Sequence, residues 1–394
     1  MRLLITSSEF PPGPGGIGTH AFQIARHLAR LGWEVRVATC QDYAEREEIR
    51  SFNVHQPFRI DTLKSAGNAL SMLASRLRAL DAAIGDFDPD VLMATGDRQT
   101  YLAGVLSRRR KLPWIAVEHG RRPPVWERWL KKHWFAHASA VVFVSEYTRS
   151  EIERMGVRTG HGVVIPNGAD TEAFRVLPSP LVDQTRRELG LAGARVIVTV
   201  GNVSERKGQD VVIRAMPEIL GSAPTTQYLC IGLPGERARF EELARRLGVA
   251  DHVRFLGSVE HDLLLRVLNV ADVFAMTSRH TAQQWEGYGI AVVEAALCGV
   301  PSVVSAQSGL AEAILDGVTG IAVPEQDRAR TAQAVLALLH DEGLRLQMGR
   351  AARERALTEQ TWQARAVRYD ALIRVVRRGA AVADRSTAYA GISA

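Results

Sequence analysis

A length of 394 residues is too great for one ordinary hydrophobic core and predicts two or three domains. A content of 46% hydrophobic and 23% charged residues is that of a globular protein, and a net charge of +6 suits an anionic partner. Three scattered cysteines exclude a disulfide framework. The first residues turn polar too early for a signal peptide, and no apolar run is long enough to span a bilayer. We therefore expect a cytoplasmic protein.

The first half of the chain is predicted to alternate strands with helices. A strand at 2–7 precedes a glycine-rich loop and an amphipathic helix with Phe22, Ala25 and Leu28 on one face. Gly32 ends that helix. Strands that alternate with helices form parallel sheets covered on both faces, so we expect a doubly wound α/β domain. The other strands are predicted at 34–39, 91–94, 114–117, 140–144 and 162–165.

The same alternation starts again after a proline-containing connector and predicts a second doubly wound domain. Its strands are predicted at 195–200, 227–231, 253–256, 273–277, 300–305 and 320–323. The predicted organisation is a first domain at 1–170, a linker at 171–184, a second domain at 185–360, a helix at 361–378 and a frayed tail at 379–394. The last helix follows all predicted strands and is expected to pack back on the first domain.

Two glutamates eight positions apart flank the start of a predicted buried helix at 290–297. Glu286 stands in a loop in which Gly287 and Gly289 allow backbone amides to approach a ligand, just before a helix N-terminus that attracts oxyanions. Glu294 lies inside the helix among apolar residues, where a carboxylate needs hydrogen-bond donors such as ribose hydroxyls. The alternative is an ordinary acid at a helix start and another on an exposed helix face.

A turn after the strand at 195–200 carries two adjacent cations. Gly201 opens the turn, and Arg206 and Lys207 are predicted to stand at the start of the next helix. Arginine holds phosphate oxygens with two hydrogen bonds, and lysine adds a compact charge. Cations oppose the dipole of a helix N-terminus, so a diphosphate between them would explain their placement. A solvated basic helix start is the alternative.

The first glycine-rich loop has two interpretations. Residues 13–18 match the G-x-G-x-x-G pattern, and Asp42 follows the next strand, where a dinucleotide fold places its ribose-binding acid. An NAD-dependent oxidoreductase is therefore an alternative from another class of enzyme. Four residues inserted before the glycines, together with Pro14, favour a mobile loop that lets the backbone approach a ligand instead.

His119 follows the strand at 114–117, at the edge where an open parallel sheet meets its ligands. It is therefore a candidate active-site residue, with a hydrogen-bonded structural histidine as the alternative.

The segment from Arg108 to Lys132 holds nine basic residues against two acids, and four of the seven tryptophans lie in or beside it. This composition suits an anionic membrane surface, or else a solvated basic face; no nucleic-acid-binding motif accompanies it.

Together these motifs resemble the retaining glycosyltransferases of family 4, group 1 glycosyl transferases with the two-domain GT-B fold. The resemblance runs from the first strand to the final helix. It is carried by Gly15 and Gly16, Glu118-His119-Gly120, Ser145, Pro166-Asn167-Gly168-Ala169-Asp170, Arg206-Lys207-Gly208, Glu286 with Glu294, and the helix after Gly309. The implied fold has two Rossmann-like domains that face a deep cleft, with the acceptor bound by the first domain.

The resemblance implies a nucleoside diphosphate sugar as donor substrate, with no metal and no other cofactor. Glu294 would bind the ribose hydroxyls, and Arg206 and Lys207 the diphosphate, beside Gly201. Gly15 and Gly16 would lie close to the phosphates, where the acceptor enters.

The sugar would be contacted by residues of both domains. Glu286 and the amides of Tyr288, Gly289 and Ile290 would touch the sugar or the developing charge, and His119 would reach the sugar from the first domain. These roles toward the sugar follow from the resemblance, which also agrees with the donor-binding roles that the residue chemistry indicates.

The expected activity is transfer of a hexose from a UDP- or GDP-sugar to a hydroxyl acceptor. A lipid-linked or cell-envelope saccharide at the inner face of the membrane is the expected acceptor, and a soluble small molecule is the alternative. Two departures from the family pattern bear on this point. The loop from Arg279 to Trp285 is longer than in many relatives and is expected to shape the sugar or acceptor pocket, and the turn at 94–97 lacks the usual histidine.

Overall fold

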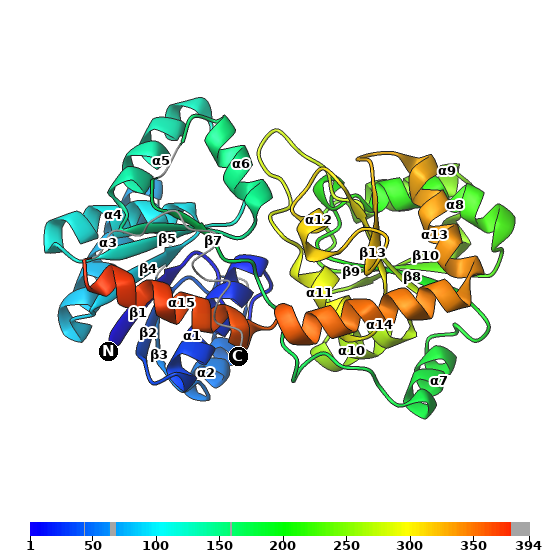
Figure 1. Ribbon diagram of the computed structural model, residues 1–394, viewed down its shortest axis with the longest axis horizontal. Helices are drawn as coiled ribbons and strands as arrows, with labels where there is room; N and C mark the ends of the chain where they lie inside the picture. The colour runs from blue at the N-terminus through cyan, green and yellow to red at the C-terminus, as the bar shows by residue number, and fades with distance from the viewer. Residues whose placement is uncertain (43, 64–67, 158–159, 380–394) are drawn as a thin grey trace. The chain divides into compact units, whose positions relative to one another are not determined.

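The computed structural model describes residues 1–394 except 43, 64–67, 158–159 and 380–394. The chain forms two compact units (Figure 1). Unit 1 contains Met1–Asn167 and the C-terminal segment that starts at Trp362, and unit 2 contains Gly168–Thr361. The stretch 171–184, predicted as a linker, includes the first half of a helix, α7 (Ser179–Glu188).

Unit 1 is built on a parallel sheet of seven strands in the order β3-β2-β1-β4-β5-β6-β7. Its strands are β1 (Arg2–Ser7), β2 (Glu34–Thr39), β3 (Arg59–Thr62), β4 (Val91–Thr95), β5 (Trp114–Glu118), β6 (Ala140–Phe143) and β7 (Gly162–Val164). Its helices are α1 (Gly16–Arg30), α2 (Arg46–Val54), α3 (Ala69–Phe87), α4 (Asp97–Arg110), α5 (Val125–His137), α6 (Glu146–Arg154) and α15 (Trp362–Arg377). The six predicted strands are confirmed to within two residues at each end.

The edge strand β3 was not predicted, because it lacks an apolar run. Arg59 and Asp61 occupy two of its four positions. Asp61 accepts a hydrogen bond from the buried Arg36 of β2 at 2.5 Å and another from Arg59 at 3.0 Å. Polar cross-strand contacts therefore help to hold a strand that hydrophobic patterning does not reveal.

Unit 2 repeats the architecture with six parallel strands in the order β10-β9-β8-β11-β12-β13. The strands are β8 (Arg195–Val200), β9 (Thr226–Ile231), β10 (Val253–Gly257), β11 (Val273–Met276), β12 (Ser302–Ser305) and β13 (Gly320–Val323). After α7, its helices are η1 (Glu205–Lys207), α8 (Gln209–Ser222), α9 (Arg237–Arg246), η2 (Ala250–His252), α10 (His261–Val270), α11 (Ile290–Leu297), α12 (Leu310–Ala313), α13 (Arg328–His340) and α14 (Glu342–Glu359). All six predicted strands and the predicted helix at 290–297 are confirmed.

Both sheets are buried on their two faces, which explains their continuous apolar strands. Leu3, Leu4 and Ile5 of β1 are inaccessible to solvent, and so are Val196, Ile197 and Val198 of β8, although successive side chains point to opposite faces. Helices on each side of the sheet supply the rest of the core.

The order of the strands reverses once in each sheet. In unit 1 the reversal lies between β1 and β4, and in unit 2 between β8 and β11. In open parallel sheets, ligands bind beyond the carboxyl ends of the strands at such a switch point. The loops that follow β1, β4, β8 and β11 are therefore where sites are expected.

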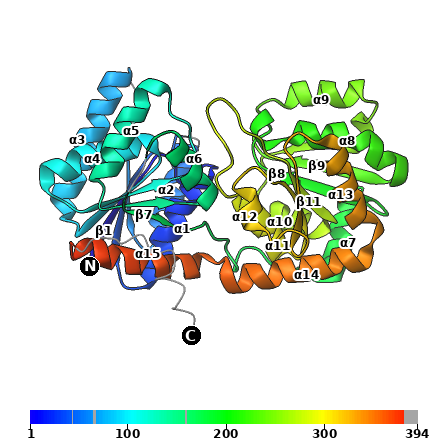
Figure 2. The ribbon, with the colours of Figure 1, turned by 45° about the horizontal axis from the view of Figure 1, so that its top comes forward.

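The final helix, α15, packs against α1 within unit 1, as Figures 1 and 2 show. The Tyr369 hydroxyl lies 2.9 Å from Nε2 of the buried His20, and the Trp33 indole donates to Asp370 at 2.7 Å. The predicted frayed tail lies outside the described residues from 380 onward. Within the described part of the chain, no helix is long and apolar enough to cross a membrane.

Candidate active site

The turn after β8 is held in one conformation by its own side chains and by the strand beside it. Gly208 has φ 76°, and a Cβ there would lie 2.0 Å from the Thr277 carbonyl oxygen. The Thr277 hydroxyl donates to the Gly208 carbonyl at 2.8 Å. The Gln209 side-chain amide donates to the carbonyls of Gly201 and Asn202 at 3.3 and 3.1 Å. The turn is thus fixed before any ligand arrives.

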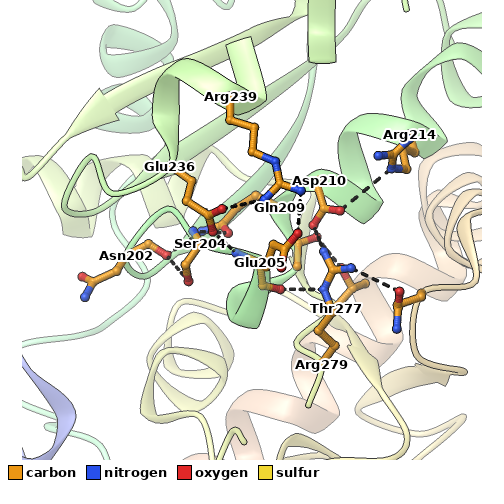
Figure 3. A network of polar contacts seen from close by, with 12 residues as sticks. Asn202, Ser204, Glu205, Gln209, Asp210, Arg214, Glu236, Arg239, Thr277 and Arg279 are labelled. Carbon is orange, nitrogen blue, oxygen red and sulfur yellow. Dashed lines mark hydrogen bonds and ion pairs between the residues drawn. The ribbon is translucent and has the colours of Figure 1, made fainter. Parts of the chain in front are cut away.

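Arg279 braces this turn from the loop that follows β11 (Figure 3). Its Nε donates to the Glu205 carbonyl at 2.7 Å, and its backbone N–H donates to the Arg206 carbonyl at 2.9 Å. Its guanidinium also forms an ion pair with Asp210, at the start of α8. The sequence predicted only that the loop from Arg279 shapes a pocket, so this contact was not foreseen.

Arg206 and Lys207 stand in the short helix η1 rather than at the start of α8, where the sequence placed them. The left-handed backbone of Gly208 separates the two helices. Arg206 forms an ion pair with Glu286, and Lys207 Nζ lies 2.8 Å from the same carboxylate oxygen. We call Arg206, Lys207 and Glu286 the Glu286 cluster.

The Glu286 cluster carries more positive than negative charge. Burial alone would raise the pKa of Glu286, but Lys207 and Arg206 together lower that pKa to about 2, so the carboxylate is ionised at neutral pH. Two cations thus share one carboxylate. Their side chains are 23% and 14% exposed, so a second anion can reach them from solvent. The arrangement therefore suits a phosphate group.

Glu294 lies in α11 and has the opposite character. Burial raises the pKa of its carboxyl to about 7, nearby Asp170 adds to the shift, and Lys207 opposes it. Among the residues that the structure describes, no side chain or backbone N–H donates to this carboxylate. A half-buried acid without donors is costly, and ligand hydroxyls would satisfy it.

The loop between the two glutamates leads into the N-terminus of α11. Gly289 has φ 84°, and a Cβ there would lie 2.2 Å from Leu310 Cδ2, so another residue would not fit. The Tyr288 side chain is 2% exposed, and its hydroxyl accepts a hydrogen bond from Gln360 at 3.0 Å. Only the backbone of Tyr288 is thus available to a ligand. The N–H groups of Gly289 and Ile290 have no hydrogen-bond acceptor within the described ranges, as the first turn of a helix requires.

In unit 1, the predicted glycines form the start of α1. Gly15 has φ 151°, and a Cβ there would lie 2.0 Å from a carboxylate oxygen of Glu9. A Cβ at Gly16 would meet no atom within 4 Å, so this backbone faces open space. The backbone at Gly16 therefore has room for the close approach of a ligand.

His119 lies beyond the end of β5, at the same edge of the sheet. Its Nε2 is 2.6 Å from the Thr95 hydroxyl oxygen, and its ring packs edge-on against His20 of α1 at 4.9 Å between centroids. Burial lowers the pKa of His119 to about 4 against the opposing effect of Asp97, so the ring is neutral at neutral pH. It can contact a substrate as a hydrogen-bonding group, not as a cation.

A buried ion network beneath His119 was missed by sequence reasoning. Lys131 of α5 is inaccessible to solvent and lies 2.5 Å from Glu118 and 2.9 Å from Asp97. Arg121 joins Asp97 at 2.6 Å and Glu127 at 3.0 Å. We call these five residues the Lys131 network. The sequence had counted Lys131 and Arg121 in a basic segment that faces either an anionic membrane or solvent, and the network corrects this, because both are paired with internal acids.

The candidate residues therefore form two groups at switch points, one in each unit. Unit 2 brings together the Glu286 cluster, Glu294 and the α11 N-terminus, and unit 1 brings Gly16 and His119 to one edge. Asp42, the acid of the dinucleotide hypothesis, lies 3.7 Å from Arg76 in an ion pair.

Comparison with known proteins agrees with this geometry. The family described as Glycosyltransferase Family 4 matches residues 14–173, and the family described as Glycosyl transferases group 1 matches residues 182–355. Anabaena HepE, solved in complex with UDP and glucose, superposes with a TM-score of 0.81 at 21% identity, covering 95% of this chain and 99% of its own. The fold is that of the GT-B class, and the two family models identify the chain as a glycosyltransferase.

Two relatives match along nearly their whole length. A GDP-mannose-dependent alpha-(1-6)-phosphatidylinositol monomannoside mannosyltransferase of Mycolicibacterium smegmatis is 30% identical over 94% of this chain and 98% of its own. A GDP-mannose-dependent monoacylated alpha-(1-6)-phosphatidylinositol monomannoside mannosyltransferase of Corynebacterium glutamicum is 32% identical over 92% and 95%. The chain belongs to glycosyltransferase family 4, the group 1 glycosyl transferases. This membership favours the transferase hypothesis over the NAD-dependent one.

Proposed function

We propose that this glycosyltransferase moves mannose from GDP-mannose to a hydroxyl group of a lipid-linked glycoside of the cell envelope, on the cytoplasmic side of the membrane. The donor and the acceptor class are supported by the two relatives at 30% and 32% identity, both named as GDP-mannose-dependent enzymes that act on phosphatidylinositol mannosides. Of the two donors expected from the sequence, a UDP- or a GDP-sugar, the relatives favour the second.

The observation that carries the proposal is the unequal charge of the Glu286 cluster. In the reaction, negative charge develops on the departing diphosphate. Arg206 and Lys207 are already held in place by the braced turn, and such preorganised charge is worth several kcal/mol in the transition state. We propose that they do this without a metal ion.

Entry of the diphosphate would also change what Glu286 does. Phosphate oxygens would compete with the Glu286 carboxylate for Arg206 and Lys207, and Glu286 would then accept hydrogen bonds from sugar hydroxyls. Glu294 would accept the two ribose hydroxyls that its position lacks. Each acid would thus gain donors from the ligand.

The proposed stereochemistry is retention at the anomeric carbon. The acceptor oxygen would bond to that carbon on the face from which the diphosphate leaves, and a phosphate oxygen would take the acceptor's proton. His119, which is neutral and hydrogen-bonded to Thr95, would contact the sugar by hydrogen bonding alone.

A soluble acceptor is the second candidate. A D-inositol 3-phosphate glycosyltransferase of Corynebacterium aurimucosum is 28% identical over 93% of this chain and 93% of its own. An inositol phosphate would offer the same kind of hydroxyl without a lipid. Only the acceptor differs between the two candidates.

Nucleotide-dependent stabilisation tests the donor, and transfer assays test the acceptor. GDP is expected to raise the melting temperature more than UDP, ADP or TDP, because the nucleotide that binds the folded protein most tightly stabilises it most. At 100 times its Kd, a ligand stabilises the folded state by about 2.7 kcal/mol. A variant with both Arg206→Ala and Lys207→Ala should lose this shift, whereas Arg245→Ala, on the exposed face of α9, should keep it.

Transfer from GDP-mannose to phosphatidylinositol mannoside but not to inositol 3-phosphate is expected. A shift with UDP alone would contradict the proposed donor, and the reverse acceptor preference would contradict the lipid-linked acceptor.

A further inference from the structure

Helix α5 of unit 1 has an inner and an outer face of opposite character. The inner face is buried and consists of Glu127, Lys131, Trp134 and Phe135. On the outer face, Val125 is 75%, Trp126 69% and Trp129 66% exposed. Both ribbon views show α5 on the outside of unit 1 (Figures 1 and 2).

The exposure of two tryptophans on one helix sets this face apart from the rest of the chain. The chain has seven tryptophans, all in the described residues, and the other five are at most 9% exposed. Single exposed apolar residues are ordinary, but large aromatic side chains grouped on one face indicate an interaction surface.

The structure also separates the basic residues of the segment 108–132 into paired and unpaired ones. Five of the nine are held by acids of unit 1: Arg109 and Arg110 by Asp81, Arg121 by Asp97 and Glu127, Arg122 by Glu151, and Lys131 by Asp97 and Glu118. Arg108 and Lys111, at the C-terminal end of α4, form no ion pair with any described residue, and neither do Arg128 and Lys132 of α5. The sequence suggested one basic patch over this segment. The structure instead leaves only four of its nine basic residues without an ion pair to a described residue, two at the C-terminal end of α4 and two on α5.

Lys132 flanks the exposed tryptophans, and Arg128 stands at the border of the outer face. Residues three and four apart on a helix are neighbours, so Lys132 lies next to Trp129, whereas Arg128, whose Nε is buried, lies next to Val125 and Lys132. The one acid among these positions, Glu127, is turned inward to Tyr101 and Arg121. The outer face of α5 thus combines indole rings with free cations and presents no carboxylate.

We propose that the outer face of α5, formed by Val125, Trp126, Arg128, Trp129 and Lys132, docks on an anionic lipid bilayer. Indole rings settle at the boundary between headgroups and acyl chains, and arginine and lysine contact lipid phosphates from the same level. A protein partner of ordinary composition would not require unpaired cations beside the tryptophans. Because α5 begins shortly after His119, docking would hold the carboxyl edge of the unit 1 sheet at the membrane surface.

Vesicle binding of the full chain tests this proposal. The protein is expected to sediment with vesicles of phosphatidylcholine mixed with phosphatidylglycerol, and not with phosphatidylcholine alone. Trp126→Ser with Trp129→Ser should abolish sedimentation. Arg128→Gln with Lys132→Gln should weaken it about 30-fold, since each cation near an anionic surface contributes about a fivefold factor. The matched control, Arg108→Gln with Lys111→Gln, removes the same charge from the same unit and should lower binding much less.

Tryptophan fluorescence supplies a second measurement on the same samples. The emission of Trp126 and Trp129 should shift to shorter wavelength on anionic vesicles and be quenched by lipids with brominated acyl chains. The serine variant, which keeps the five buried tryptophans, should show neither effect. Equal binding to neutral vesicles, no sedimentation, or equal loss with the α4 and α5 charge variants would overturn the proposal. Stabilisation by GDP should be unchanged in all of these variants, so the proposed donor is tested separately.

Discussion

The Lys131 network and the Glu286 cluster lie at corresponding edges of two similar sheets, yet they treat charge differently. In unit 1, Lys131 and Glu118 are 0% and 3% exposed, and Lys131 together with the partly exposed Arg121 meets three largely buried acids. In unit 2, two cations share one carboxylate and remain open to solvent. A network whose charges are satisfied internally supports the fold, whereas one with surplus charge is prepared for a ligand. The balance of charge, rather than the number of ion pairs, distinguishes the two.

The largest effect is expected from Lys131→Met in the buried network. Removing one partner of a buried ion pair leaves uncompensated charge and typically costs about 3–5 kcal/mol. Urea unfolding should show this loss. Lys132→Met, one position along and exposed, should change stability by less than about 0.5 kcal/mol. Equal stability of the two variants would mean that the network does not support unit 1.

A smaller effect of opposite sign is expected from Glu294→Gln. The pKa of Glu294 is about 7 in the folded protein against an ordinary value of 4.5, so the folded state holds this proton more tightly than the unfolded chain. Its contribution to stability is complete below pH 4.5 and is lost as the pH rises through about 7. At pH 8 the glutamine variant should therefore be more stable than the wild type by roughly 3 kcal/mol, with little difference at pH 4.

The same variant should lose most of its stabilisation by GDP, since a neutral amide replaces the acceptor of the ribose hydroxyls. Glu354→Gln, on the exposed face of α14, should change neither the stability at pH 8 nor the stabilisation by GDP. If Glu294→Gln were only as stable as the wild type at pH 8, the buried Glu294 carboxylate would not destabilise the ligand-free protein.

The smallest of the three effects concerns Arg279, which supports the Glu286 cluster without belonging to it. Arg279→Met removes a hydrogen bond to the Glu205 carbonyl and an ion pair with Asp210. Charged hydrogen bonds are worth about 1.5–3 kcal/mol, so GDP affinity measured by calorimetry should fall about 10- to 100-fold. Arg214→Met is the matched control, because Arg214 lies 3.9 Å from Asp210 and makes no contact with the turn in the described structure. Equal affinities would assign the support of the turn to Gln209 and Thr277 instead.

Most of the fold could be predicted from the sequence because both sheets are buried on two faces. The middle residues of strands such as β1 and β8 form apolar runs, and the glycines that end helices mark the connections. Glu286 lies before the helix at 290–297 and Glu294 within it, as predicted, whereas Arg206 and Lys207 fall in η1 rather than at the start of α8. Their roles toward the donor stay predictions.

The features that escaped prediction depend on contacts between residues distant in sequence. Lys131 belongs to a basic stretch and was counted with it, because nothing local shows that Asp97 lies beneath the helix. Arg279 meets Glu205, 74 positions away, and the polar edge strand β3 depends on Arg36 of its neighbour. Hydrophobic periodicity carries no information about such polar pairs.

The return of α15 to unit 1 has a consequence for how the protein is made. Unit 2 is continuous in sequence from Gly168 to Thr361, so its chain is complete while the last helix is still being synthesised. Unit 1 is interrupted, and α1 lacks its partner, with His20 and Trp33 uncovered, until Tyr369 and Asp370 leave the ribosome. Domains generally fold as units, the N-terminal one first during synthesis. Here the order is reversed at the last step: the half that is translated first is the half that finishes folding last.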